Sequence, residues 1–321
     1  MVSSKNNLLE NHCLNFFSDL PYRKLILAYS GGIDSSVLLE CILNIKDKLG
    51  ISLRTIHINH NLNNFSNQYQ NHCETIARQK NIRHNNFNVF LDNTSNLEEK
   101  CRELRYNELS KNCRKDEVII LAHHLDDQIE TFLIRMFRGS SIKGMSAMSN
   151  ITVINNVILL RPLLNIKKED IITYSKKNSI SYIEDITNVD ETHDRNFIRK
   201  NLLPLIKKRW TSIEKSIHNN ISIFSIQNQF LNDQASMLLE SCSENNFESL
   251  CISKIKKLSY SAQVIIIHHW VFQLNQTILN LRQIHEIIKF FDATNDKNPL
   301  FEFNNVRIIK NRDRLLIKLQ K

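Results

Sequence analysis

A glycine turn between an apolar run and an amphipathic run constrains the fold of this chain more than any other feature. The turn comprises Ser30, Gly31, Gly32, Ile33, Asp34, Ser35 and Ser36. Residues 25–29 before it predict a buried strand, and residues 37–43 after it predict a helix. Glycine permits positive φ and a close approach of backbone to ligand, and a helix N-terminus offers unpaired N–H groups. We therefore expect the turn to bind a phosphate group, and hence a nucleotide.

The turn differs from the two common phosphate-binding motifs. The Walker motif G-x-x-x-x-G-K-[ST] needs a lysine that is absent here, and the dinucleotide motif G-x-G-x-x-G has another glycine spacing. The pattern S-G-G-x-D-S resembles the pyrophosphate loop (PP-loop) of the ATP pyrophosphatase superfamily, whose members cleave ATP between the α- and β-phosphates. A serine-capped Gly-Gly turn without a ligand is the structural alternative. Asp34 favours the nucleotide site, because a carboxylate beside phosphates calls for Mg²⁺ between them.

Composition places the chain among globular proteins with a polyanionic partner. Its 321 residues predict two domains, and 42% hydrophobic residues are enough for a sizeable core. A net charge of +9 favours nucleic acid as the partner, although abundant Asn, Ile and Lys also fit an AT-rich coding sequence. The 7 cysteines show no metal-ligand spacing. With no signal-peptide pattern and no apolar run of roughly 20 residues, we expect a reduced, cytoplasmic protein without a membrane partner.

Strand and helix patterns alternate through the first part of the chain. Strands are predicted at residues 51–59, 82–90 and 118–122, and helices at residues 66–80, 97–113 and 126–138. This alternation predicts an α/β fold with a doubly wound parallel sheet. Ligands of such sheets bind beyond the carboxyl ends of the strands. We therefore expect the glycine turn and the segments 57–60 and 123–127 to meet at one edge.

The pattern changes beyond about residue 210. Helices are predicted at residues 216–240, 262–275 and 282–291, and short strands at residues 300–303, 306–310 and 314–319. This arrangement indicates a second, smaller α+β domain. We place the boundary between residues 1–215 and 216–321, although no linker composition marks it.

The second informative segment, residues 123–131, reads His-His-Leu-Asp-Asp-Gln-Ile-Glu-Thr. Asp127 and Glu130 are three residues apart and share one face of the predicted helix, and Asp126 borders that face. Acids at a helix start also favour the dipole without any catalytic role. The adjacent histidines favour a functional site, and the spacing does not match the zinc motif H-E-x-x-H.

These carboxylates suit the second half of an adenylation reaction. When ATP is split to AMP and an acceptor is adenylated, a nucleophile must follow. An amine nucleophile is cationic at neutral pH, so a carboxylate pair can bind and orient it before it loses a proton. We expect Asp127 and Glu130 to hold such a cation.

A series of ordered motifs over roughly the first two-thirds of the chain resembles the bacterial tRNA(Ile)-lysidine synthases. It includes the glycine turn, residues 57–60 (His-Ile-Asn-His), 96–106 and 121–131, Arg138-Gly139, the Arg-Pro-Leu-Leu of 161–164, and residues 184–188, 195–199 and 203–204. A weaker likeness covers residues 305–319. The resemblance implies an adenine nucleotide alpha hydrolase-like PP-loop catalytic domain over residues 1–215 and a tRNA-binding domain over 216–321.

The resemblance also implies a reaction. Members of the family bind ATP and Mg²⁺ and adenylate the ring carbonyl of the wobble cytidine in an isoleucine tRNA with a CAU anticodon. The amine of free L-lysine then displaces AMP and gives lysidine. The change switches codon reading from AUG to AUA and charging from methionine to isoleucine.

The resemblance implies a role for each matching residue. The seven residues of the glycine turn would hold ATP, with Asp34 toward Mg²⁺. The catalytic and lysine-binding residues would be Asp127, Glu130, His123 and Asp126. The candidates for RNA or phosphate contacts are Arg102, Arg105, Arg138, Arg195 and Arg199. As an alternative, Arg102 and Arg105 form weak surface pairs with the glutamates of their own helix.

Some features depart from the family pattern, and some alternatives stay open. Asn61 and Asn63 stand where the family often has Gly and Arg, Thr187 replaces a serine, and the chain is shorter than members with two C-terminal domains. A tRNA thiolase is the alternative enzyme, but such enzymes often use C-x-x-C pairs, which are absent here. A GMP synthetase would need a glutaminase domain, and a non-catalytic tRNA-binding protein would not need Asp34, Asp127 and Glu130. The sequence does not decide whether the protein is a homodimer.

Overall fold

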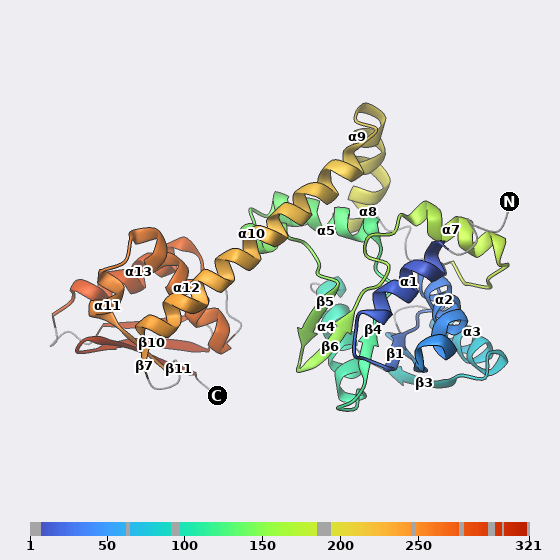
Figure 1. Ribbon diagram of the computed structural model, residues 1–321, viewed down its shortest axis with the longest axis horizontal. Helices are drawn as coiled ribbons and strands as arrows, with labels where there is room; N and C mark the ends of the chain where they lie inside the picture. Colours follow the sequence, from blue (N-terminus) through green and yellow to red (C-terminus); the bar gives the residue numbers. More distant parts are fainter. Residues whose placement is uncertain are drawn as a thin grey trace. The chain divides into compact units, whose positions relative to one another are not determined.

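The computed structural model describes most of the chain, and its residues divide into two compact units, Met1–Ser222 and Ile223–Lys321 (Figure 1). The described residues are 8–61, 65–90, 97–184, 194–244, 248–275, 279–294, 299–303 and 305–319. The boundary that the sequence predicts, between residues 215 and 216, lies within helix α10 (Ile213–Cys242). The assignment of separate functions to the two parts stays a prediction.

The first unit is built on a six-stranded sheet with the strand order β3-β2-β1-β4-β6-β5. Its strands are β1 (Lys24–Ala28), β2 (Ser52–Asn59), β3 (Arg83–Asn88), β4 (Val118–Ile120), β5 (Ile151–Ile154) and β6 (Val157–Leu160). All neighbours pair in parallel except β5 and β6, which are antiparallel. The predicted parallel sheet is confirmed, and its order reverses beside β1, so that β2 and β4 flank the strand that leads into the glycine turn.

Helices cover both faces of this sheet. The helices of the first unit are α1 (Leu8–Ser18), α2 (Ile33–Leu49), α3 (Ser66–Gln79), α4 (Leu97–Lys111), α5 (Leu125–Phe137), α6 (Ile142–Met145), α7 (Lys168–Lys177), α8 (Asp194–Phe197) and α9 (Leu203–Arg209), with a π-helical segment at Ile198–Leu202. In β1, Leu25 and Leu27 pack with α1, α2 and α7, whereas Ile26 packs with α4 on the other face. A strand buried on both faces reads as a continuous apolar run, as the sequence shows.

The hairpin β5–β6 is absent from the sequence-based prediction. Its two-residue turn is Asn155-Asn156, and both residues have positive φ, 50° and 61°. Such a turn matches the twist of an antiparallel pair, and asparagine adopts it more readily than most residues. The signal was therefore present in the sequence, as two asparagines between apolar runs.

The second unit is a five-stranded antiparallel sheet with helices, in the strand order β7-β8-β11-β10-β9. The strands are β7 (Ser243–Glu244), β8 (Ser249–Cys251), β9 (Leu300–Phe303), β10 (Val306–Asn311) and β11 (Arg314–Leu319). The helices are α11 (Ile252–Lys256), α12 (Tyr260–Asn275) and α13 (Leu281–Lys289), with a 3-10 turn at Phe290–Asp292. Trp270 is fully buried at the centre of this core. The smaller α+β domain is thus confirmed, with β7, β8 and α11 added.

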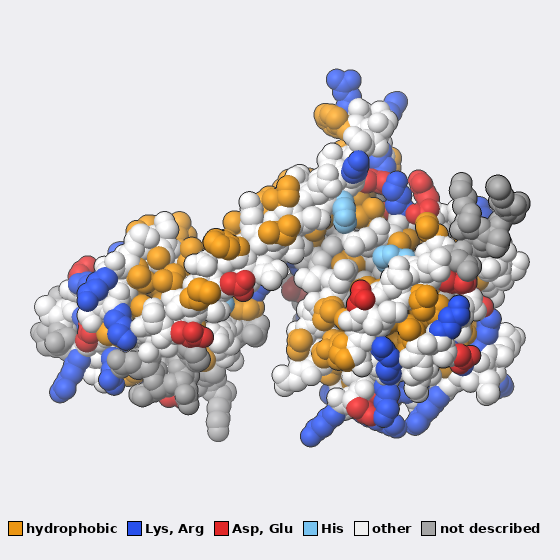
Figure 2. Space-filling view, in the orientation of Figure 1, with side chains coloured by type: hydrophobic (Ala, Val, Ile, Leu, Met, Phe, Trp, Pro, Cys, Tyr) orange, Lys and Arg blue, Asp and Glu red, His pale blue; other side chains and the backbone are white. Residues whose placement is uncertain are grey.

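The C-terminal end of α9 carries exposed basic side chains. Lys and Arg side chains project at the end of α9 (Figure 2), where Lys208, Arg209 and the following Trp210 are exposed. None of the helices in the described ranges has the length and apolar character needed to cross a membrane.

Candidate active site

The glycine turn joins β1 to α2 and packs against α3. Gly31 has a φ of 79°, in the left-handed region. A Cβ at this position would lie 3.0 Å from Sγ of Cys73 and 3.3 Å from Cδ2 of His72. Glycine is therefore required both by the backbone conformation and by the close contact with α3.

The serines of the turn bond to each other and to its backbone. The hydroxyl oxygens of Ser30 and Ser35 lie 3.1 Å apart, and the Ser35 hydroxyl donates to the carbonyl oxygen of Gly32 at 3.0 Å. Ser36 is buried, with its hydroxyl 3.2 Å from that of Tyr29. These bonds preorganise the turn and the first N–H groups of α2.

A buried histidine from the segment 57–60 supports the base of the turn. Nδ1 of His57, on β2, donates to the carbonyl oxygen of Tyr29 at 2.9 Å. Burial lowers the pKa of His57, so the ring stays neutral. The left-handed φ of Asn61, 52°, also explains why an asparagine can stand where the resembling family often has glycine.

Asp34 connects the turn to the second predicted segment. Oδ1 of Asp34 lies 2.5 Å from Nζ of Lys168 and 3.7 Å from Nε2 of His124. The same Nε2 atom is 3.6 Å from Oδ2 of Asp127. The structure thus brings together the two segments that the sequence placed at one sheet edge, with His124 between the carboxylates.

Lys168 is a member of this group that sequence reasoning missed. It is the first residue of α7, where a cation is disfavoured by the positive end of the helix dipole. A lysine at a predicted helix N-terminus was therefore the sequence signal that could have identified it, because such a lysine indicates an acidic partner from another segment.

Asp127 caps the start of α5. Its Oδ2 atom accepts a hydrogen bond from the backbone N–H of His124 at 2.9 Å. Burial raises the pKa of the Asp127 carboxyl, but the nearby imidazoles of His124 and His123 and the bond from the backbone N–H of His124 outweigh burial and lower this pKa below its ordinary value. Asp127 is therefore an anion at neutral pH.

Glu130 is fully buried and is engaged by two arginines. Arg199 donates to both of its oxygens, from Nε at 2.6 Å and from Nη2 at 3.0 Å, and Nε of Arg195 lies 3.1 Å from Oε2. Arg199 also approaches Oδ1 of Asp127, at 3.5 Å. Asp127 and Glu130, the two carboxylates predicted to hold a lysine ammonium, thus contact guanidinium groups in this structure. Arg195 and Arg199, two of the arginines predicted to contact RNA, face Glu130.

Among the described residues, the other predicted arginines, Arg138, Arg105 and Arg102, take no part in the ion pairs around Glu130. Arg138 pairs with Asp194 at 2.8 Å, and both side chains are largely exposed. Arg105 is exposed, and the guanidinium of Arg102 lies 5.2 Å from the centroid of the Tyr106 ring. Asp126 lies close enough to Lys207 for its charge to contribute to the raised pKa of that lysine.

Two other features help to delimit the site. Asn63, Thr187 and residues 185–188 lie outside the described residues.

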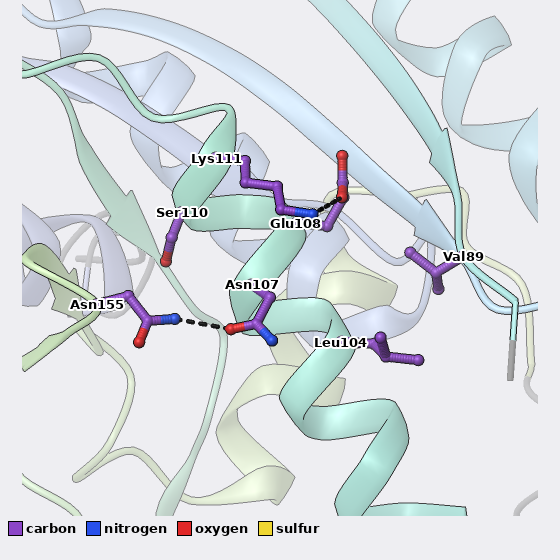
Figure 3. A pocket seen from close by; sticks show the side chains of 7 residues that line it. All are labelled: Val89, Leu104, Asn107, Glu108, Ser110, Lys111 and Asn155. Atoms are coloured by element: carbon purple, nitrogen blue, oxygen red, sulfur yellow. Dashed lines mark hydrogen bonds and ion pairs between the residues drawn. The ribbon is translucent and has the colours of Figure 1, made fainter. Parts of the chain in front are cut away.

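A pocket of about 390 Å³ beside α4 (Figure 3) is lined by Val89, Leu104, Asn107, Glu108, Ser110, Lys111 and Asn155. It contains none of the predicted residues, so we do not assign it to this site.

Comparison with known proteins identifies relatives over most of the chain. Residues 5–206 match the family of PP-loop domains. The tRNA(Ile)-lysidine synthase of Wigglesworthia glossinidia brevipalpis is 35% identical over 307 residues, which cover 92% of this chain and 76% of that protein. The synthase of Buchnera aphidicola subsp. Baizongia pistaciae is 35% identical over 298 residues, covering 92% and 68%. That of Histophilus somni (strain 129Pt) is 31% identical over 296 residues, covering 92% and 69%.

A solved structure supports the fold. The U34-tRNA thiolase of Methanococcus maripaludis, determined with its [4Fe-4S] cluster, has a TM-score of 0.60 and covers 69% of this chain and 79% of its own. At 14% identity this likeness concerns the fold alone. Among the residues that the structure describes, no group of three or more His, Cys, Asp or Glu side chains is placed to hold a metal ion.

Proposed function

This chain belongs to the PP-loop family and, within it, to the tRNA(Ile)-lysidine synthases, and on that premise we propose that it ligates free L-lysine to the wobble cytidine of a CAU-anticodon isoleucine tRNA. The enzyme uses ATP, and the products of the proposed reaction are lysidine, AMP and diphosphate. The convergence of the glycine turn and the start of α5 at Asp34, His124 and Asp127 carries the proposal. It brings a phosphate-binding turn next to an anion that can receive an amine.

The glycine turn would hold the phosphates of ATP through its serines and the first N–H groups of α2. Asp34 would hold Mg²⁺, because its carboxylate already attracts a cation, Lys168, at 2.5 Å, and Mg²⁺ needs few protein carboxylates beside phosphate oxygens and water. Mg²⁺ would supply charge neutralisation at the phosphates. Lys168 adds a second positive charge and, released from Asp34, can bind a phosphate oxygen.

Asp127 and Glu130 would share the task of holding lysine unequally. Glu130 already accepts three short contacts from two guanidinium groups, whereas among the described residues a single longer contact, with Arg199 at 3.5 Å, joins Asp127 to a guanidinium group. We therefore assign the ammonium of lysine first to Asp127. Glu130 would order Arg195 and Arg199 beside it.

The RNA contacts would come from the exposed cations. Exposed ion pairs contribute little stability, so a phosphate can compete for Arg138 against Asp194. The exposed Arg105 and the basic end of α9, with Lys208 and Arg209 next to the exposed Trp210, extend this set, and the half-buried Arg102 lies on the same helix as Arg105. An exposed tryptophan next to basic residues can stack on an unpaired base.

The decisive experiment is a reconstitution with ATP, Mg²⁺, isotope-labelled lysine and a CAU-anticodon isoleucine tRNA. We expect pyrophosphate release that requires both tRNA and lysine, and a nuclease fragment carrying label at the wobble cytidine. The matched control is the same tRNA with a different wobble base. Incorporation of sulfur, or pyrophosphate release that does not depend on lysine, would refute the proposal.

A further inference from the structure

The guanidinium of Arg161, in the Arg-Pro-Leu-Leu segment after β6, is fixed by three hydrogen bonds. Its side chain is almost completely buried, with 2% of the residue exposed. Nη1 donates to the carbonyl oxygen of Ser149 and to the hydroxyl of Thr152, both at 2.8 Å. Nε donates to Nδ1 of His123 at 3.2 Å. The two bonds to Ser149 and Thr152 orient the group, and the third acts on a residue of the candidate active site.

The bond to His123 determines where the imidazole carries its proton. Arginine has five N–H donors, no acceptor, and stays protonated in proteins. Nδ1 of His123 must therefore accept, and the ring hydrogen of the neutral imidazole resides on Nε2. Among the residues that the structure describes, Nε2 has no hydrogen-bond partner. The ring thus presents an N–H group that is available to a ligand.

The surroundings keep this ring neutral. Burial lowers the pKa of His123 to about 3; the charge of Asp127 opposes this shift, whereas those of Arg161, Arg102 and Arg195 add to it. The only basic nitrogen of the neutral ring is occupied by Arg161. His123 is therefore unsuited to accept a proton, and it keeps its Nε2–H group across the physiological range.

We propose that Arg161 is a positioning residue that fixes His123 as a neutral hydrogen-bond donor, through Nε2–H, to a phosphoryl oxygen of the bound nucleotide. The inference rests on the proposed function, since it assumes that ATP binds at the glycine turn. A phosphoryl oxygen is favoured because His123 directly precedes His124, whose Nε2 lies 3.7 Å from Oδ1 of Asp34 in the glycine turn. No proton is transferred: the donor stabilises charge on the phosphoryl group while the bond to diphosphate breaks.

The first test reads the tautomer directly and needs no activity. ¹⁵N NMR of histidine-labelled protein, with the resonance assigned by loss of signal in His123→Gln, should show His123 in the Nε2–H form. Arg161→Met should change this to a mixture of tautomers. Arg54→Met is the matched control, because the guanidinium of Arg54 is likewise held by hydrogen bonds in the same unit, to Glu117 at 2.6 and 2.7 Å, and among the described residues it makes no contact with His123. A His123 resonance unaffected by Arg161→Met, in protein that stays folded, would overturn the assignment.

If Arg161→Met fails to fold, two other measurements test the tautomer of His123 and its phosphoryl ligand. A non-hydrolysable ATP analogue added to the wild-type protein should shift the Nε2 resonance of His123, whereas lysine or tRNA alone should not. A shift produced only by tRNA or lysine would contradict the phosphoryl assignment. Arg161→Lys keeps a donor and should retain the wild-type tautomer.

A substitution series separates a donor from a base. The amide N–H of glutamine reaches a position near Nε2, whereas that of asparagine lies near Nδ1. Pyrophosphate release should therefore survive in His123→Gln and fall about 10²-fold in His123→Asn and His123→Ala, as for the loss of one transition-state donor. Equal losses in all three variants would refute the donor role. If the wild-type enzyme forms no lysidine, the proposed function fails, while the NMR result still decides the role of Arg161.

Discussion

Replacing Glu130 by glutamine tests the arrangement of charges at the centre of the site. Glu130 is completely buried, and its two oxygens receive three contacts of 2.6 to 3.1 Å from Arg195 and Arg199. Glutamine keeps the shape and one acceptor oxygen. It removes the negative charge and turns the second oxygen into an N–H₂ group that faces a guanidinium.

The expected loss of stability depends on which interactions Arg195 and Arg199 keep after Glu130 loses its charge. Removing one partner of a buried ion pair costs about 3–5 kcal/mol. Arg199 has 39% of its side chain exposed, so water can solvate part of its charge, and Asp127 stays within reach. We therefore expect a loss of about 2–3 kcal/mol in the free energy of unfolding of the first unit. Glu108→Gln is the control, because the ion pair of Glu108 with Lys111, at 3.7 Å, is a surface contact and glutamine keeps an acceptor oxygen for the amide of Asn112, so the change should cost less than about 0.5 kcal/mol.

Two probes can follow this loss separately in the two units. Trp270 is buried in the second unit, whereas Trp210 is exposed, so the unfolding change in tryptophan fluorescence reports mainly the second unit. Circular dichroism at 222 nm reports both units. In Glu130→Gln, the dichroic transition of the first unit should move to lower urea concentration, and the fluorescence transition should stay in place. The KM for lysine should rise more than the KM for ATP. A variant with wild-type stability and an unchanged lysine requirement would refute both the ion-pair reasoning and the role in lysine use.

Four further predictions concern the turn, the metal, pH and RNA. Gly31→Ala should cost about 1–2 kcal/mol through its left-handed φ alone, and the contact with Cys73 should raise the KM for ATP further; a variant with unchanged affinity for ATP would show that the turn has another conformation. Asp34→Ala should abolish pyrophosphate release and keep the dichroism of the wild type, and an active variant would exclude Asp34 as the metal ligand. The bond from Arg54 holds the pKa of Glu117 below its ordinary value of 4.5. The stabilisation by this pair is therefore complete above about pH 4.5 and is lost as pH falls through the lower folded-state pKa. Glu117→Gln should flatten the acid side of the curve of unfolding free energy against pH, and an unchanged curve would contradict this. Replacing Lys208 and Arg209 by alanine should reduce the slope of the salt dependence of tRNA binding by about one unit for each phosphate that is no longer neutralised, whereas the same change at Lys176 and Lys177, exposed on α7, should not; equal effects would mean that only net charge matters.

The sheet of the first unit was predictable because its strands bury both faces. Continuous apolar runs at residues 25–29 and 118–122 alternate with helical patterns, and only a parallel sheet covered by helices accommodates both. Because ligands and strand ends share one edge of such a sheet, Asp34 and Asp127 are also expected near each other from the sequence. The hairpin β5–β6 was not predicted, because its strands have only four residues each, and so short a run gives little periodicity.

The partners of the charged residues were less predictable, because they depend on contacts between distant segments. Glu130 and Arg199 are 69 positions apart, and Lys168 and Asp34 are 134 positions apart. A sequence pattern identifies a cation, but it does not say whether that cation faces solvent, RNA or a buried acid. Arg195 and Arg199 illustrate the difficulty, because the π-helical segment that contains Arg199 has no simple signature in the sequence.

The full burial of Glu130 explains why two arginines are needed beside it. An isolated carboxylate at this depth would cost several kcal/mol or take up a proton, and burial does raise the pKa of Glu130. Guanidinium groups from Arg199 and Arg195 oppose this rise and stabilise the charged form of the carboxyl. In the proposed reaction an incoming lysine ammonium would therefore bind at Asp127, the acid with the weaker guanidinium contact. On this reasoning Asp127→Asn should impair lysine binding more than Glu130→Gln does, while Glu130→Gln should destabilise the fold more, and the reverse order would show that lysine displaces Arg199 from Glu130 instead.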